Sequence, residues 1–251
     1  MSVNPKFLVK GSTLDTSKIT FSDAKSNDSG GKSIYMNYDN HPLLLQTPKM
    51  SLPYGLSVFD KGEYPKYTIE GSFRDMDTNQ SLNNFYDKLE ELEEKLVEGA
   101  MNNSMSWFKK KKMGEEVATA LLNPLLRKSR DKETGELDGR YPPTFRMKLP
   151  VINGKTTCKI FDFSKNELDS STFEELFNKG GTIKAILRCN GVWIAGGKYG
   201  CSWGIVQVMV DAVKNVDNYS FLEDNDDNED NKDNDDNSDS DSEDELVEDS
   251  D

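Results

Sequence analysis

Histidine is almost absent from this chain, and cysteine is rare. His41 is the only histidine in 251 residues, which excludes a metal site with two histidines and a Ser-His-Asp triad built on any other position. The cysteines Cys158, Cys189 and Cys201 have no paired spacing, which argues against a zinc ribbon or a disulfide framework and indicates a reducing compartment. These absences predict a protein that is not an enzyme and that uses no metal or cofactor.

Long apolar runs are also missing. No stretch approaches the ~18–20 apolar residues that span a bilayer, and the N-terminus has no signal-peptide core. We expect an intracellular protein with no membrane partner.

Acidic residues are concentrated at the C-terminus. Glu223–Asp251 holds 17 Asp or Glu and one Lys, whereas residues 1–222 hold 30 Lys or Arg against 28 Asp or Glu. Because this segment repels itself and has almost nothing apolar to bury, residues 217–251 are predicted to be a disordered acidic tail. Such a polyanion can occupy a cationic groove until nucleic acid displaces it. Its one apolar point, Leu246-Val247, is a candidate docking motif for a partner, and the alternative is an unspecific solubilising tail.

Short β segments, broken by proline and glycine, make up most of the remaining chain. Asn153-Gly154 is the strongest turn signal and predicts a two-residue hairpin. The predicted strands are residues 33–38, 43–46, 67–73, 144–152, 156–161, 183–188, 192–195 and 203–210.

One segment has helical periodicity. Its apolar residues, spaced by three and four, are Leu82, Phe85, Leu89, Leu92 and Leu96. They predict an amphipathic helix that begins at a capping box of Asp77 and Gln80, ends near Gly99 and packs on the sheet. A dimerising coiled coil is the alternative, although the stripe covers only about two heptads. Shorter helices are predicted at 115–122 and 171–177.

These elements predict an α+β fold with an OB-like antiparallel β-barrel and inserted helices. The predicted boundaries are an N-terminal extension at 1–30, the OB-like domain at 31–216 with a helical insertion at about 78–126, and the tail at 217–251.

Cations and aromatic residues occur together in three parts of the chain. Trp107-Phe108 precede Lys109–Lys112, the final hairpin combines aromatic side chains with Lys198, and a weaker group surrounds Tyr35 and Tyr67. This combination is typical of single-stranded nucleic-acid binding, in which cations follow the phosphates and bases stack on rings. The alternative is that Trp107 belongs to the core beside a solvated lysine loop. At least one tryptophan of the final hairpin is expected to be buried.

The predicted DNA-binding residues are Trp107, Phe108, Lys109, Lys110, Lys111, Lys112, Arg127, Arg130, Arg140, Arg146, Trp193, Lys198, Tyr199 and Trp203, and the weaker candidates are Tyr35, Tyr38, Lys66, Tyr67 and Arg74. Among these, we expect Trp107, Tyr199 and one of Trp193 or Trp203 to stack on bases.

The order of these features resembles the single-stranded-DNA-binding proteins of nucleocytoplasmic large DNA viruses, of the asfarvirus and giant-virus type. The likeness covers roughly residues 30–212 and depends chiefly on Tyr-Pro-Pro-Thr-Phe-Arg-Met-Lys at 141–148 and on Trp193…Lys198-Tyr199-Gly-Cys-Ser-Trp203. It implies an OB-like core, sequence-independent binding of single-stranded DNA, a role in viral DNA replication, recombination or repair, and a location in the host cell's viral replication compartment, in cytoplasm or nucleus, or in the virion.

The sequence therefore predicts a non-enzymatic single-stranded-DNA-binding protein. RNA is an alternative ligand, the tail is expected to recruit replication proteins, and self-association on DNA is a further expected property. The chain ends at Asp251 without the terminal aromatic residue of bacterial and phage tails of this kind. Three alternatives stay open: a virion structural or core protein that does not bind DNA, an acidic chaperone of basic proteins, and an unrecognised enzyme.

Overall fold

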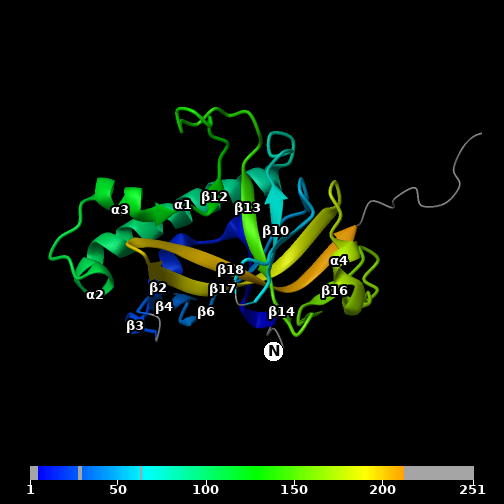
Figure 1. Ribbon diagram of the computed structural model, residues 1–251, viewed down its shortest axis with the longest axis horizontal. Helices are drawn as coiled ribbons and strands as arrows, with labels where there is room; N and C mark the ends of the chain where they lie inside the picture. Colours follow the sequence, from blue (N-terminus) through cyan, green and yellow to red (C-terminus); the bar gives the residue numbers. More distant parts are fainter. Residues whose placement is uncertain (1–4, 28–29, 63, 212–251) are drawn as a thin grey trace, which may run out of the picture. The chain divides into compact units, whose positions relative to one another are not determined.

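The computed structural model describes residues 5–27, 30–62 and 64–211 (Figure 1). These residues belong to one unit of the chain, which spans Met1–Val213. The predicted disordered tail lies outside the described residues, so its conformation stays a prediction. Among the described residues, no helix is both long enough and apolar enough to cross a membrane.

The longest strands form one hairpin at the end of the described chain. β17 (Thr182–Ala195) and β18 (Lys198–Asp211) have 14 residues each and pair antiparallel. Gly196 and Gly197 make the turn with φ of 59° and 76°, a conformation that glycine adopts without a steric penalty. The sequence predicted three shorter strands here. The structure instead has two continuous strands whose two register shifts are β-bulges, which bend a strand without ending it.

Five strands pair in a closed circuit. In pairing order they are β17, β8 (Met50–Ser51), β10 (Lys66–Ser72), β13 (Thr144–Leu149) and β18, which returns to β17. β10 and β13 contribute six residue pairs, whereas β8 meets β10, and β13 meets β18, through one pair each. The predicted α+β class is confirmed. The OB-like barrel itself stays a prediction.

The prediction of an antiparallel sheet was wrong, because the sheet is mixed. The parallel pairings are those of β1 (Leu8–Lys10) with β7 (Leu44–Gln46), and of β11 (Leu122–Asn123), β13 and β16 (Lys159–Phe161) with β18. Parallel neighbours need long connections rather than tight turns. Here β1 and β7 are connected through residues 11–43, and β11, β13 and β16 reach β18 through long segments that include α4 and β17, which a reading of local turn signals does not capture.

The other strands extend the sheet, which has 13 strands in the described part of the chain, or form small ribbons. β9 (Leu56–Phe59) pairs with β10, and β12 (Leu126–Arg127) pairs with β13. β4 (Lys32–Ile34) pairs with β17, and β3 (Lys25–Ser26) pairs with β4. A separate sheet contains β2 (Ile19–Phe21), β5 (Met36–Tyr38) and β6 (His41–Pro42). The hairpin predicted at Asn153-Gly154 is formed by β14 (Val151–Ile152) and β15 (Lys155–Thr156).

Helix α1 (Gln80–Asn102) covers the core, as its periodicity predicts (Figure 1). All five apolar residues of its stripe are buried in the main hydrophobic cluster. The ring of Phe85 lies 5.8 Å from that of Phe73 and 5.9 Å from that of Phe145, measured between centroids. Because the stripe is already buried against the sheet, it is not free to form the alternative coiled coil.

Both predicted ends of α1 were wrong. The side chain of Asn79, not Asp77, caps the helix by accepting the N–H of Leu82 at 3.2 Å. Gly99 lies inside the helix, where a Cβ atom would come within 2.6 Å of Phe21 Cε2. Gly99 therefore serves close packing against β2, and the helix continues for three more residues.

The remaining helices are short. α3 (Glu115–Leu121) and α4 (Phe173–Leu176) lie within predicted helical segments, whereas α2 (Ser104–Phe108) was not predicted. The 3-10 helices are Pro5–Phe7, Gly11–Thr13, Thr16–Lys18 and Ser170–Thr172.

The N-terminal segment, predicted as an extension, is built into this unit. β1 pairs with β7, and Leu14 and Ile19 are buried in the core. At Gly11 the backbone lies so close to α1 that a Cβ atom would meet Phe85 Cδ2 at 2.5 Å. The described residues before position 28 therefore contribute to the hydrophobic core.

Candidate nucleic-acid interface

The pairing of β10 with β13 separates an apolar face from a polar one. Side chains alternate along a strand, so every second pair shares a face. Ile69, paired with Met147, is buried in the core. The opposite face carries the pairs Thr68–Lys148, Glu70–Arg146 and Ser72–Thr144. The candidate site lies on this polar face.

A groove of about 1120 Å³ lies on this face, between the β9–β10 and β14–β15 hairpins and the β17–β18 hairpin. We call it the groove. Its cationic lining residues are Lys66, Arg146, Lys148 and Arg188, and no Asp or Glu lines it among the described residues. A concave surface with charge of one sign attracts a polyanion, because the potentials of its charges add.

The lysines of the groove repel one another. Burial lowers the pKa of Lys148, and the nearby charge of Lys66 lowers it further. Neither lysine forms an ion pair with any described residue. An anion beside Lys148 would favour its charged form.

Apolar side chains lie exposed along the same groove. Val58, Phe59 and Ile152, all of which line it, have 52%, 53% and 63% of their surfaces exposed. Tyr67 also lines the groove, but its half-buried ring packs on the core side of β10, 5.5 Å from the ring of the buried Phe173. Cations beside exposed rings are the combination that binds single strands, because every base offers a flat face for stacking.

Two glycines of β18 let side chains of β17 pack closely on this face: Asn190 lies against Gly204, and Trp193 lies against Gly200. Gly200, Ser202 and Gly204 alternate with the buried Cys201, Trp203 and Ile205, so the glycines belong to the groove side. Gly204 pairs with Lys148 on one side and with Arg188 on the other. A Cβ atom at Gly200 would lie 2.8 Å from Trp193 Cζ2, so the half-buried indole of Trp193 rests against this backbone.

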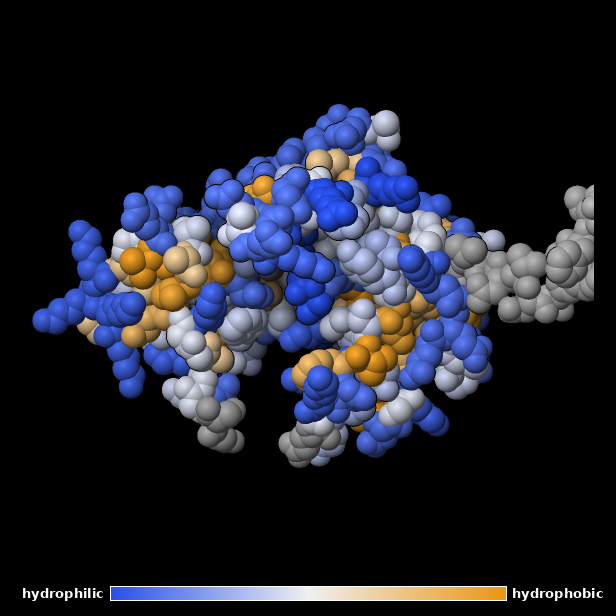
Figure 2. All heavy atoms as spheres, turned by 45° about the horizontal axis from the view of Figure 1, so that its top comes forward, coloured by the Kyte–Doolittle hydropathy of each residue, from blue (hydrophilic) through white to orange (hydrophobic). Residues whose placement is uncertain are grey.

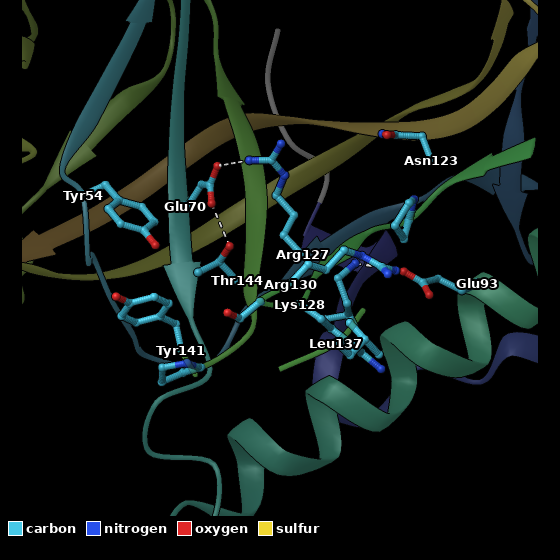
Figure 3. Close-up of a pocket in the computed structure, with 14 residues that line it drawn as sticks. Tyr54, Glu70, Glu93, Asn123, Arg127, Lys128, Arg130, Leu137, Tyr141 and Thr144 are labelled. Atoms are coloured by element: carbon cyan, nitrogen blue, oxygen red, sulfur yellow. Dashed lines mark hydrogen bonds and ion pairs between the residues drawn. The ribbon is translucent and has the colours of Figure 1, made fainter. Parts of the chain in front are cut away.

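Glu70 links two arginines at the edge of the groove, and Figure 3 shows its contacts with Arg127 and Thr144. Its Oε1 accepts from Arg127 Nη1 at 2.7 Å and from Arg146 Nη2 at 2.8 Å, and its Oε2 accepts from Thr144 Oγ1 at 2.7 Å. Burial raises the pKa of Glu70, but the hydrogen bonds from Thr144 and Arg146 and the charge of Arg127 outweigh it, so the pKa lies below its ordinary value. The carboxylate is ionised at neutral pH and fixes both guanidinium groups.

A second hollow, of about 700 Å³, lies on the other side of Glu70. We call it the tyrosine pocket, because Tyr54 and Tyr141 form one side of it, opposite α1 (Figure 3). Arg127, Lys128 and Arg130 also line it. Glu93 of α1 accepts the backbone N–H groups of Leu125 and Leu126 at 2.6 and 2.8 Å, which holds the segment before Arg127 on the helix.

The structure contradicts the prediction that Trp107 and Tyr199 stack on bases, and it excludes Trp203 as the hairpin tryptophan that does so. The side chains of Trp107, Tyr199 and Trp203 are 2%, 0% and 1% exposed, so no base can reach them. Trp107 packs edge-on against Phe21, and Trp203 against Phe145, with ring centroids 5.4 and 6.1 Å apart. The alternative interpretation of Trp107 as a core residue is confirmed. Of the two hairpin tryptophans, Trp193 is the accessible one.

The structure divides the other predicted residues between several places. Lys66, Tyr67 and Arg146 line the groove, Arg127 and Arg130 line the tyrosine pocket, and the Arg140 guanidinium lies 5.6 Å from the ring centroid of Tyr141. The other predicted residues that line neither hollow are Phe108, Lys109, Lys110, Lys111 and Lys112 beside α2, Trp193 and Lys198 on the β17–β18 hairpin, and Tyr35, Tyr38, Arg74 and Arg140.

Sequence reasoning missed several lining residues. Lys148 was detectable, because it and Arg146 alternate with Phe145, Met147 and Leu149 as an outward cationic row on a strand. Phe59, Tyr54 and Tyr141 carry no comparable local signal. Arg188 reaches the groove only through pairing with a distant part of the chain.

The rare residues identified in the sequence take no part in either hollow. The three cysteines are buried, as predicted, and burial raises the pKa of Cys158 to about 11. The ring of His41 is exposed and stacks on Phe7 with 3.9 Å between centroids. Within the described residues, no three His, Cys, Asp or Glu side chains gather in a way that could hold a metal ion.

Comparison with protein families gives one match. A family of unknown function, DUF5871, matches residues 69–223. The chain belongs to this family. The DUF5871 segment contains Glu70, Arg127, Arg146, Lys148 and Arg188, and it begins just after Lys66 and Tyr67.

Solved structures of other proteins are also similar to this chain. The single-stranded DNA-binding protein from bacteriophage Enc34, in complex with ssDNA, is similar over 78% of this chain and 97% of that chain, with 12% identity and a TM-score of 0.43. The single-stranded DNA-binding protein gp2.5 of bacteriophage T7 is similar over 72% of this chain and 98% of that chain, with 10% identity and a TM-score of 0.43. No curated protein matches the sequence.

Replacing Glu70 should weaken the fold in a pH-dependent manner. Because its pKa is lowered in the folded state, Glu70 contributes stability above its ordinary pKa of 4.5, and this contribution is lost as pH falls through the lowered value. We expect Glu70→Gln to reduce the free energy of unfolding at neutral pH by about 1–3 kcal/mol. Denaturant unfolding from about pH 7 to about pH 3 should show the difference from wild type shrinking below 4.5.

The exposed Glu94 of α1 provides the control for this measurement. Glu94→Gln should leave stability nearly unchanged at every pH. A Glu70→Gln effect that is independent of pH would mean that the pKa of Glu70 does not differ between the folded and unfolded protein.

Removing the hydroxyl of Tyr199 should stabilise the protein. The hydroxyl is buried with no hydrogen-bond partner among the described residues, and burial raises the pKa of Tyr199 to about 12. A buried unpaired hydroxyl costs about 1–3 kcal/mol, so Tyr199→Phe should raise the unfolding midpoint. Tyr35→Phe, at a 56% exposed position, should leave it unchanged. Unaltered binding of oligo-dT by Tyr199→Phe would agree with a core role, whereas weakened binding would restore Tyr199 as a site residue.

Proposed function

We propose that this protein binds single-stranded DNA in the groove without sequence preference. The observation that carries the proposal is the lining of the groove, where four cations and no described carboxylate lie beside exposed apolar side chains. Phosphates would contact Lys66, Arg146, Lys148 and Arg188. Bases would stack on Phe59, the exposed ring in the lining of the groove.

An exposed ring in the groove favours a single strand over a duplex. In a duplex the bases are stacked inside the helix and offer only their edges, whereas a single strand presents the faces of its bases. Stacking on a ring is tolerant of sequence because every base has a flat face, and RNA is the alternative ligand to test.

The wider role that we propose is in DNA replication, recombination or repair in a DNA virus, without enzymatic activity. This proposal joins the groove to the sequence resemblance described above. Self-association along DNA and recruitment of replication proteins belong to the same proposal.

We also propose that residues 223–251 compete with DNA for the groove. This segment carries 17 acidic residues against one lysine, and the groove is lined by cations. A tethered polyanion acts at a high effective concentration, so even weak contacts would lower the apparent affinity for DNA. Nucleic acid, with its denser charge, would displace it.

Lys148→Ala should weaken DNA binding and reduce its dependence on salt. Each phosphate contact on a single strand contributes about −0.7 to the slope of log K against log salt, so four contacts predict a slope of about −3. The variant should be less steep by about 0.7. Fluorescence anisotropy with labelled oligo-dT at several salt concentrations measures both quantities.

Lys10→Ala provides the matched control, because Lys10 is an exposed lysine on β1 that lines neither hollow. It should bind as wild type does. Equal losses for both variants would indicate a diffuse charge effect and would place the strand outside the groove. Absence of binding by the wild type at low salt would favour the virion structural protein.

Truncation after Phe221 should tighten DNA binding, most strongly at low salt. Removing the acidic segment removes the internal competitor, and salt screens both the competitor and the ligand. Anisotropy with oligo-dT should be compared for the full chain and for residues 1–221. A truncated protein that binds no more tightly than the full chain would show that the acidic segment does not compete.

A further inference from the structure

The two hollows are joined by a fixed pair of arginines. Arg146 belongs to the lining of the groove and Arg127 to that of the tyrosine pocket, and both bind the same Oε1 atom of Glu70. The side chains of the arginines are 48% and 46% exposed, whereas that of Glu70 is 8% exposed. The carboxylate is therefore covered, and the two guanidinium groups place positive charge between the two hollows.

Exposed apolar side chains are concentrated in these two hollows. Among the described residues, ten large apolar side chains are exposed, and six of them line one hollow or the other. In the tyrosine pocket they are Tyr54, Leu137 and Tyr141, with exposures of 59%, 56% and 57%. Exposure of this kind in a concave site indicates a ligand that covers the rings. Figure 2 shows that apolar surface on the displayed face occurs in separate areas with hydrophilic side chains between them.

The carboxylates of the tyrosine pocket are already engaged. Glu70 is held between Arg127 and Arg146, and Glu93 accepts two backbone N–H groups. Lys128 is paired with Glu90 at 2.8 Å. Arg130 donates to the carbonyl oxygen of Gly135 at 2.9 Å and forms no ion pair with any described residue. A phosphate can therefore meet Arg130 and the exposed part of Arg127, whose side chain is 48% exposed although it is paired with Glu70.

We propose that the tyrosine pocket binds the next one or two nucleotides of the strand that fills the groove. This inference rests on the proposed function. A base stacks on Tyr141 or Tyr54, and its phosphate lies against Arg127 and Arg130. The Arg140 guanidinium already lies over the Tyr141 ring, which extends the cationic surface to the outer end of the pocket. The volume of about 700 Å³ is within the ~300–1,000 Å³ range of ligand pockets.

A length series of oligonucleotides tests this arrangement. The affinity of the full-length protein for oligo-dT of increasing length should rise in one step while the groove fills and in a further step when the strand reaches the tyrosine pocket. The double variant Tyr54→Ala/Tyr141→Ala should lose the second step, with binding of the longer oligonucleotides weakened about 5- to 100-fold, the range for loss of stacking. Its binding of the shortest oligonucleotides should equal that of wild type.

Tyr35→Ala is the matched control, since Tyr35 is 56% exposed, has Lys25 over its ring and lines neither hollow. It should show both steps. A double variant that retains the second step would overturn the inference while leaving the groove in place. Failure of wild type to bind any length would overturn the proposed function and this inference with it.

Photocrosslinking supplies a second measurement that needs no substitution. Oligo-dT with a single 5-iodouracil at successive positions should crosslink to Tyr54 or Tyr141 only when the label lies toward one end of the strand. Crosslinks to these tyrosines from every position, or from none, would overturn the inference.

Discussion

The register between β10 and β13 is the constraint on which the site depends. It places Ile69, Met147 and Phe145 under helix α1, and it places Lys148, Arg146 and Glu70 on the opposite face. A shift of one residue would exchange the two faces, since strand side chains alternate with a period of two. The same pairing closes the circuit of strands through β8 and β18. The hydrophobic core and the cationic groove are therefore two results of one alignment.

The parts of the fold that depend on local pattern were predictable from the sequence. The leucine stripe of α1 is a repeat within one segment, and Asn153-Gly154 is a turn signal within four residues, so neither needs information from the rest of the chain. The cap of α1 was misplaced by two residues because Asp77 and Asn79 both suit that position chemically. Gly99 was misinterpreted because its reason, the ring of Phe21, comes from a strand distant in sequence.

The candidate site was predictable only in part, because burial is a property of the whole fold. Trp107 beside four lysines has the same local sequence whether its ring faces the core or the solvent, and Phe21 and Tyr199 decide the matter by packing on it. Tyr199 and Trp203 alternate correctly with Gly200 and Gly204, but the alternation alone does not say which face is buried. Arg146 and Lys66 were included, whereas Arg188 joins them only through the pairing of β17 with β18.

The repulsion between Lys66 and Lys148 has a consequence for how the protein behaves when empty. Like charges held together in a partly buried site oppose the compact state, and an anion that enters removes this opposition. If an anionic ligand binds the groove as proposed, its binding is coupled to folding, since whatever binds only the folded form also shifts the folding equilibrium toward it. The bound protein would then unfold less readily than the empty one.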